Sequence, residues 1–524
     1  MSATIPARAT PPDDLLGGPA RPEGTVPAQP TGDVPVDGPV DTARPAADAE
    51  RSVAAASGNS LFGRGMLYVV VAVLQLVTGA LASPVLAHVL DDPAQLGSLS
   101  TAIALHQLLA ALLLVGLDHA IVLRRAQDGH DDVVRGLATT AMLVVSGLTL
   151  LTWATAAWWA PALGMADSPL LTLTILWTVP SAGILISSGL LLAADRLRPY
   201  TVVGALTAVG GQVVGLTLLL VQQGTTGTAS VTHFAAGLVA ADLVGCLVGF
   251  ALTRPRLRGA LSWRTVGPAL AIGGPLVIDS VSVFALNAGD RILLQRIAGA
   301  EEVGRYQIAY TLGYVAVQII GLMSWTWTPR FAAVSDRFLR WRLIGDSRDT
   351  ILRLLSPVVL GVVLGAPVGL RIVAPASFRP ETLLPVVLLV LLSAYPVAAS
   401  SAVGRMLVTD GRTRTLAACT LAAAAVNVGL NLLAIPRFGI EGAAAATLAA
   451  FAVQASLQRL VVGHRASFPR TPRPVLLEAA VVVALAGATL LLPQGDVTDG
   501  VRFGLAVLCL PWFFRRFRQA RAQG

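Results

Sequence analysis

From residue 65 onward the sequence is a succession of apolar segments of about 20 residues each, separated by short polar loops. A helix of that length crosses the hydrocarbon core of a bilayer and satisfies its own backbone hydrogen bonds there. The succession therefore predicts an all-α polytopic membrane protein with about 14 transmembrane helices. Charged residues make up only 13% of the chain, roughly half their share in a soluble protein.

The spacing of the apolar segments divides the chain into four parts. Residues 1–62 are rich in Pro and Ala and are predicted to form a disordered cytoplasmic tail. Residues 63–257 are expected to form an N-terminal six-helix bundle and residues 258–466 a second, pseudo-symmetric one, followed at 467–524 by a two-helix extension with a basic C-terminus. The expected spans are 65–90, 96–121, 135–160, 169–193, 200–221, 231–253, 266–289, 304–329, 349–374, 381–403, 413–435, 440–462, 474–493 and 499–515.

The basic residues, all of them arginines, indicate how the chain is oriented. If the N-terminus lies inside the cell, 31 of the 38 fall in inside segments, and the first three outside loops contain none. The positive-inside rule then places both termini in the cytoplasm. Because the arginines are spread over short loops, with no basic domain, the net charge of +8 does not indicate a nucleic-acid partner.

Two distant stretches match without a gap. The first, at 90–105, reads LDDPAQLGSLSTAIAL, and the second, at 297–312, reads IAGAEEVGRYQIAYTL, so that Gly97 aligns with Gly304. Either the apolar residues match by chance, or one helix-turn-helix unit is used twice. Repeats with the same topology are related by an axis along the membrane normal, and they place a shared cavity between the two halves.

Polar residues within or beside the apolar segments are the candidates for function, because an ion in hydrocarbon must be paired or must face a watery cavity. The stretch 287–312 carries six charges, and behind its turn at 299–304 polar residues recur at helical steps of three and four, from Gln307 to Gln318. The candidates for substrate binding are Arg291, Arg305, Asp290, Gln307, Tyr310, Tyr314, Gln318, Gln75 and His106, and those for ion coupling are Asp279 and Asp242.

Each candidate also has a structural alternative. Asp279 is either functional or part of a structural hydrogen bond, and Asp242 has no evident partner in the sequence. Arg291 and Arg305 either line a cavity or are solvated surface charges. His106 is either a packed, hydrogen-bonded residue or a proton relay. In a cavity, guanidinium groups would suit phosphate, and aromatic and amide groups would suit a sugar.

No catalytic motif is present, and the loops are too short for a catalytic domain, so the chain is predicted not to be an enzyme and to need no cofactor. Its three cysteines, Cys246, Cys419 and Cys509, all lie in apolar segments without metal-binding spacing.

Three stretches resemble the polysaccharide (O-antigen/exopolysaccharide) flippase family of the multidrug/oligosaccharidyl-lipid/polysaccharide exporter superfamily. They read DRILLQRIAGAEEVGRYQIAY at 290–310, NVGLNLLAIPRFGIEGAAAATLAA at 427–450, and GRGMLYVVVAVLQLVTGALASPVLAHVLDDPAQLGSLSTA at 63–102. The resemblance implies two six-helix bundles around a partly cationic cavity, formed mainly by the first, second, seventh and eighth helices. It also implies that the protein is located in the bacterial cytoplasmic membrane.

The implied activity is export of an undecaprenyl-diphosphate-linked oligosaccharide by alternating access, with membrane lipids and other polysaccharide assembly proteins as further candidate partners. Peptidoglycan-precursor flippases of the superfamily carry several arginines in their first two helices. Here the first helix has only Arg64, at its inner end, which favours a capsule, exopolysaccharide or teichoic-type glycan over lipid II. The alternatives are a cation-coupled drug or metabolite antiporter and a membrane-embedded glycosyltransferase or polymerase.

Overall fold

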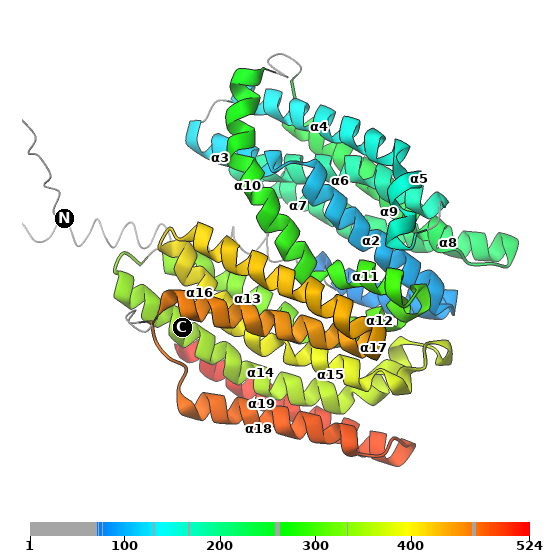
Figure 1. Cartoon of the computed structure of the whole chain (residues 1–524), viewed down its shortest axis with the longest axis vertical. Coiled ribbons are helices and arrows are strands. Elements are labelled where there is room, and N and C mark those ends of the chain that lie inside the picture. The colour runs from blue at the N-terminus through cyan, green and yellow to red at the C-terminus, as the bar shows by residue number, and fades with distance from the viewer. Residues whose placement is uncertain are drawn as a thin grey trace, which may run out of the picture. The chain divides into compact units, whose positions relative to one another are not determined.

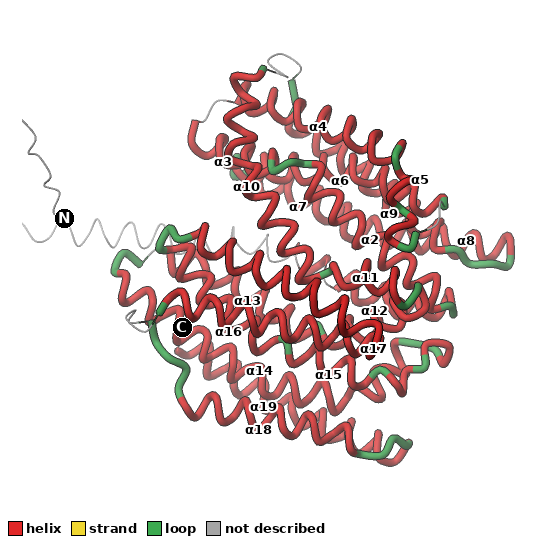
Figure 2. The backbone as a smooth tube through the Cα atoms, viewed as in Figure 1, coloured by secondary structure: helices red, strands yellow, loops and turns green. Residues whose placement is uncertain are grey.

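Every regular element in the part of the chain that the structure describes is helical (Figure 2). This computed structural model describes residues 71, 73–75, 77–128, 131–165, 168–256, 262–332, 334–463 and 468–523, without the side chains of residues 126–128, 131, 322, 324–330, 332 and 521–523. The described residues belong to one compact unit, Ser60–Gly524. The predicted tail, residues 1–62, lies outside the described residues.

Twelve helices among the described residues are long and apolar enough to cross a membrane, compared with the 14 spans expected. The lower count comes from one range that holds two helices and from one expected span that is divided. The expected spans 413–435 and 440–462 both lie in Thr413–Val462, where the chain folds back at Gly439 (φ 54°), so that Nε2 of Gln454 donates to the Thr420 hydroxyl at 3.2 Å, and they form two helices as expected. The expected span 304–329 is divided at Tyr314 into two shorter helices, α12 (Ala300–Gly313) and α13 (Val315–Ala332).

The first set of helices is formed by residues 73–253, and several of its members begin at a side-chain cap. Ser168 accepts a hydrogen bond from the backbone N–H of Leu171, and Ser230 accepts one from Thr232, which satisfies N–H groups that a helix start leaves free. The set comprises Val73–Leu90, α2 (Pro93–Leu113), α3 (Leu117–Asp128), α4 (Asp131–Ala154), α5 (Ala156–Trp159), η1 (Pro161–Leu163), α6 (Pro169–Ala193), α7 (Leu197–Ala205), η2 (Leu206–Gly210), α8 (Gly211–Thr226) and α9 (Val231–Thr253).

The second set follows at residues 263–462, and the last two long helices, α18 (Arg473–Ala488) and α19 (Asp496–Gln523), pack against its member α14 (Arg337–Val373). Figure 1 shows α18 and α19 beside α14, at the edge farthest from the first set. The remaining elements are α10 (Trp263–Asn287), α11 (Gly289–Ile297), α12, α13, α14 (Arg337–Val373), η3 (Ala376–Phe378), η4 (Pro380–Thr382), α15 (Leu384–Leu392), α16 (Ala394–Thr409), α17 (Thr413–Val462), α18 (Arg473–Ala488), η5 (Thr489–Leu491) and α19 (Asp496–Gln523).

The two sets meet most extensively where α2 crosses α12, and this crossing is reciprocal. A Cβ on Gly97 would lie 1.8 Å from the carbonyl oxygen of Ala300, and a Cβ on Gly304 would lie 1.9 Å from that of Pro93. Gly97 and Gly304 are the aligned glycines of the two similar stretches, and Pro93 and Ala300 are aligned as well. Such an exchange of equivalent contacts is expected at a local twofold axis. Only glycine permits this backbone approach.

A second contact between the sets is made by α10, which packs against α3 and α4 near its start and against α17 (Figure 1). Here too the backbones touch. A Cβ on Gly273 of α10 would lie 2.3 Å from the carbonyl oxygen of Gly116, in the turn between α2 and α3. Gly116 has a φ of 71°, and the β-branched Val115 before it has a φ of 50°, so this turn departs from both helices. The turn ends the expected span 96–121 early, at Leu113.

Candidate functional site: an arginine-bearing cavity between the helix sets

A cavity of about 700 Å³ lies between the two sets of helices. Its walls come from Val73–Leu90, α2, α8 and α9 on one side and from the end of α10, α11, α12 and α13 on the other. Six of the predicted substrate-binding residues line it: Gln75, Arg291, Gln307, Tyr310, Tyr314 and Gln318. We call it the Arg291 cavity, because Arg291 is the charged residue among the described residues that line it.

The guanidinium group of Arg291 is held in place by three hydrogen bonds and an aromatic face. Nε donates to Oε1 of Gln307 at 3.0 Å, and Nη1 donates to the carbonyl oxygen of Asn287 at 3.0 Å and to Oδ1 of Asp290 at 2.9 Å. The guanidinium carbon lies 4.2 Å from the centre of the Tyr310 ring, a cation–π distance. These contacts fix the orientation of the cation before any ligand arrives.

The tyrosines and glutamines of α12 and α13 form one continuous wall. Their spacing of three and four residues places them on the same face of a helix, as the sequence predicts. The rings of Tyr310 and Tyr314 stack at 4.9 Å, and the Tyr314 hydroxyl donates to Oδ1 of Asn287 at 2.9 Å. Asn287, at the end of α10, therefore orients both Arg291 and Tyr314.

Asp290 lies behind Arg291 and does not line the cavity. Its side chain is 2% exposed and accepts hydrogen bonds from Arg291 and from the Tyr306 hydroxyl, with the Thr447 hydroxyl at 3.5 Å. A buried carboxylate needs such partners. The structure thus places this predicted substrate-binding residue as the counter-charge of the cavity's arginine.

Arg305 lies away from the cavity, although the sequence places it in the same charged stretch. Its Nη1 donates to Glu302 at 2.6 Å, its Nη2 to the Thr382 hydroxyl at 2.6 Å, and its Nε to the carbonyl oxygen of Phe378 at 3.3 Å. These bonds tie α12 to η3 and η4. Its role in substrate binding stays a prediction, which its position does not favour.

His106 and Asp242 belong to one buried cluster inside the first set. The His106 ring stacks on Trp177 at 4.1 Å, and the indole N–H of Trp177 donates to Oδ2 of Asp242 at 2.7 Å. Trp177 is the partner of Asp242 that the sequence does not reveal. Nε2 of His106 pairs with the Ser181 hydroxyl at 3.2 Å, while its Nδ1 is buried with no hydrogen-bond partner among the described residues.

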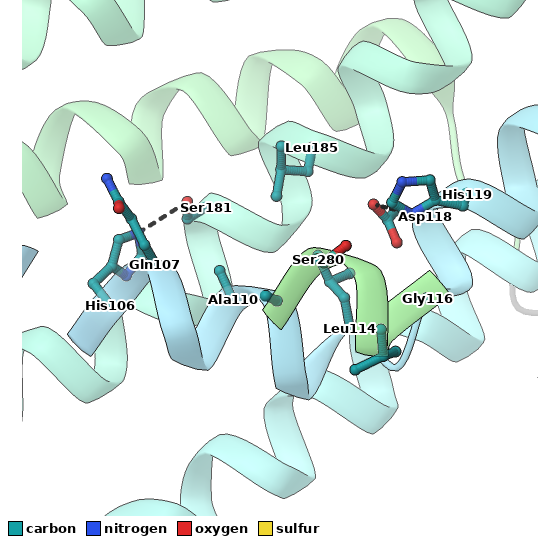
Figure 3. Close-up of a pocket in the computed structure, with 12 residues that line it drawn as sticks. His106, Gln107, Ala110, Leu114, Gly116, Asp118, His119, Ser181, Leu185 and Ser280 are labelled. Carbon is teal, nitrogen blue, oxygen red and sulfur yellow. Dashed lines mark hydrogen bonds and ion pairs between the residues drawn. The ribbon is translucent and has the colours of Figure 1, made fainter. Parts of the chain in front are cut away.

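A second cavity, of about 300 Å³, extends from His106 toward the turn between α2 and α3. Figure 3 shows His106 and Ser181 at one end and Asp118 and His119 at the other, with Ser280 of α10 between them. Asp279, predicted as an ion-coupling residue, is the neighbour of Ser280 and does not line either cavity. Gln107 lines both cavities, so they adjoin each other.

Sequence reasoning missed part of the cavity wall. The cavity-lining side chains of α8 and α9 are Gln212, Phe234 and Leu238. An amide within an apolar span was a signal for Gln212. Phe234 and Leu238 resemble every other apolar residue of their span, and only the packing of the helices identifies them.

The lining is suited to a particular kind of ligand. One oriented guanidinium can bind phosphate through paired hydrogen bonds, whereas phenol and amide groups suit uncharged hydroxyls and ring faces. The described residues contain no group of three or more His, Cys, Asp or Glu side chains that could hold a metal ion.

The fold, a multi-pass helical bundle with a central cavity between two sets of helices, is shared with solved membrane transporters. The chain is similar to the lipid II flippase MurJ in an inward closed conformation, with a TM-score of 0.66, 13% identity, and coverage of 87% of this chain and 100% of that one. An inward-facing multidrug resistance MATE family transporter of the MOP superfamily gives a TM-score of 0.59, 15% identity, and coverage of 81% and 99%. At such low sequence identities, the similarity shows that the fold is shared.

The family follows from the sequence itself. Residues 62–335, more than half of the chain, match the family model described as polysaccharide biosynthesis protein, and the chain belongs to that family. A search of curated protein sequences finds no match.

Proposed function

We propose that this protein is a flippase that moves a lipid-diphosphate-linked oligosaccharide across the bacterial cytoplasmic membrane, for cell-surface polysaccharide biosynthesis. The observation that carries the proposal is the Arg291 cavity, in a chain of the polysaccharide biosynthesis family with a transporter fold. The cargo would be of the undecaprenyl-diphosphate type, and both termini would lie in the cytoplasm, as the arginine distribution indicates. Other polysaccharide assembly proteins are candidate partners.

The geometry suggests how the cavity would hold this cargo. Arg291 would bind a phosphate oxygen, and Tyr310, Tyr314 and the amides of Gln307 and Gln318 would contact the sugar. The carboxylate of Asp290 already neutralises much of the guanidinium charge. Binding of the diphosphate would therefore be weaker than at an unpaired arginine, which suits a transporter that must release its cargo.

The contacts between the helix sets suggest how the cavity would change sides. In this structure the α2–α12 crossing closes one end of the interface through Gly97 and Gly304. In the proposed orientation this end faces outward. Alternating access requires the two glycines to separate while the opposite end, where the backbones of Gly116 and Gly273 touch, stays closed. The reciprocal contact would act as the outer gate.

The direct test is loss and restoration of glycan export. Deletion of the gene should reduce surface glycan and raise the amount of lipid-linked precursor in the inner leaflet. Wild-type protein should reverse both effects, whereas Arg291→Ala should not, at a matched amount of protein in the membrane. Unchanged surface glycan in the deletion strain, with no precursor accumulation, would contradict the proposal.

The second candidate is a cation-coupled exporter of drugs or metabolites. It is favoured by the titratable cluster at the second cavity, Asp118 and His119, with Asp279 beside it. This candidate predicts that Asp279→Asn abolishes drug export while surface glycan stays intact. The flippase predicts that deletion of the gene reduces surface glycan. Measuring both in the same strains separates the two functions.

A further inference from the structure

Charged residues from both helix sets lie at or beside the second cavity. Nδ1 of His119 lies 3.0 Å from Oδ2 of Asp118 in α3, and Asp279 of α10, next to Ser280 in the wall of the same cavity, adds to the attraction on this imidazole. We infer that Asp118, His119 and Asp279 form a proton-binding site that controls the contact between α10 and α3. This inference concerns the contact between the helix sets and does not depend on the proposed cargo.

The site is open to protons but shielded enough for charge to matter. The His119 side chain is 50% exposed and that of Asp118 is 24% exposed, and both line the second cavity (Figure 3). Asp118 lies in the first turn of α3, where the helix dipole favours a negative charge. Carboxylates near an imidazole favour its protonated form.

The neighbouring helices add little competing charge. The helices in contact with α3 include α4, α6 and α10. In α6 no side chain is charged. The α4 carboxylate of Asp132 is paired with Arg256, and Arg135 also has a partner of its own. On α10 the other charged residue is Arg264, near its start. The described charges that act on His119 are therefore those of Asp118 and Asp279.

The contact that this site would control has little tolerance for movement. The backbones of Gly116 and Gly273 touch within the same α3–α10 junction, with no room for a side chain at either position. When His119 carries a proton, it is a cation beside Asp118 of its own helix, and it also attracts the carboxylate of Asp279 on α10. When the proton leaves, this attraction across the junction is lost.

The direction of the pH effect follows from this charge balance. Because the docked arrangement holds the proton more tightly than an undocked one, docking of α10 on α3 is favoured at low pH. It weakens as the pH rises through the titration of the imidazole. A metal ion is a poorer candidate for the bound cation, since no described group of three such ligands could hold one.

The test is a distance measurement on purified full-length protein in lipid without any substrate. Trp263→Cys at the start of α10 and Val133→Cys on α4 provide two labelling sites whose native side chains are 74% and 43% exposed, whereas the three native cysteines are buried. Pulsed spectroscopy of spin labels at these sites should show two populations between about pH 5 and about pH 8. Their ratio should change by up to about tenfold per pH unit, the limit for one proton.

Three variants decide the outcome. His119→Gln should abolish the pH dependence, and Asp279→Asn should reduce it strongly, because the charge across the junction is lost. His88→Gln, at an exposed histidine on another helix, should leave it unchanged. A distance distribution that does not change with pH, or that changes equally in wild type and His119→Gln, would overturn the inference. If His119→Gln does not fold, an undiminished pH dependence in Asp279→Asn would overturn it. Because no substrate is present, the result is separate from that of the glycan-export test.

Discussion

Arg291 and Arg305 come from one charged stretch and are each 8% exposed, yet their surroundings differ. Arg291 lines the central cavity, and its counter-charge Asp290 is 2% exposed. Arg305 points into the segment of η3 and η4, and its counter-charge Glu302 is 29% exposed. The first pair is built into the cavity wall, whereas the second fastens α12 to a connecting segment.

The comparison shows that burial of an arginine does not by itself indicate a binding site. What distinguishes the two is the direction of the guanidinium group. In the Arg291 cavity the group lies against Tyr310 at the edge of an open space. At Arg305 all three guanidinium nitrogens donate to protein oxygens.

The counter-charges should differ most in stability. Asp290→Ala leaves the Arg291 guanidinium and the Tyr306 hydroxyl without their partner, and breaking a buried pair costs about 3–5 kcal/mol. Glu302→Ala removes a partly exposed carboxylate and should cost about 1 kcal/mol or less. Thermal unfolding of the purified variants in detergent measures both. Equal losses of stability would contradict the distinction between the two pairs.

The arginines themselves should differ most in transport. Arg291→Lys keeps the charge but loses the planar group that bonds Gln307 and stacks on Tyr310, and glycan export should fall about tenfold, equivalent to about 1.4 kcal/mol. Arg305→Lys should leave export per folded protein near wild type. The measurement is surface glycan normalised to protein in the membrane. A larger loss for Arg305→Lys would place Arg305 in the transport path instead.

Much of the fold follows from the sequence, because the bilayer strongly restricts the backbone structures that can cross it. The expected spans 169–193 and 231–253 coincide with α6 and α9, since an apolar run and a serine cap together determine where such a helix begins. The wall of Gln307, Tyr310, Tyr314 and Gln318 follows from helical spacing. Its role in binding stays a prediction.

The direction of side chains between helices could not be predicted in the same way. Nothing in the sequence separates Arg291 from Arg305, because the position of η3 and η4 beside α12 is a tertiary contact. Likewise, the partner of Asp242 is Trp177 on a different helix, and His119 gains its significance only from the crossing of α10. Such contacts depend on how the two helix sets pack.

A smaller effect is expected from the tyrosine hydroxyls of the cavity wall. Tyr314→Phe removes a 2.9 Å hydrogen bond to Asn287 but keeps the stacking on Tyr310, and it should cost about 1 kcal/mol of stability. Tyr310→Phe removes a longer bond, of 3.3 Å, and should cost less. Thermal unfolding compares the two. A larger loss for Tyr310→Phe would show that its hydroxyl does more than this bond indicates.

The smallest effect is expected at Arg256, which also pairs with a carboxylate but at the surface. Arg256 and Asp132 have side chains that are 52% and 70% exposed, so water screens their attraction. Arg256→Ala should therefore change stability by less than about 1 kcal/mol and leave glycan export unchanged. Arg291→Ala also removes one positive charge, but from the cavity. Measuring both variants under the same conditions therefore tests whether the position of the lost charge matters. If both substitutions impair export equally, the total charge of the protein matters and the position of Arg291 does not.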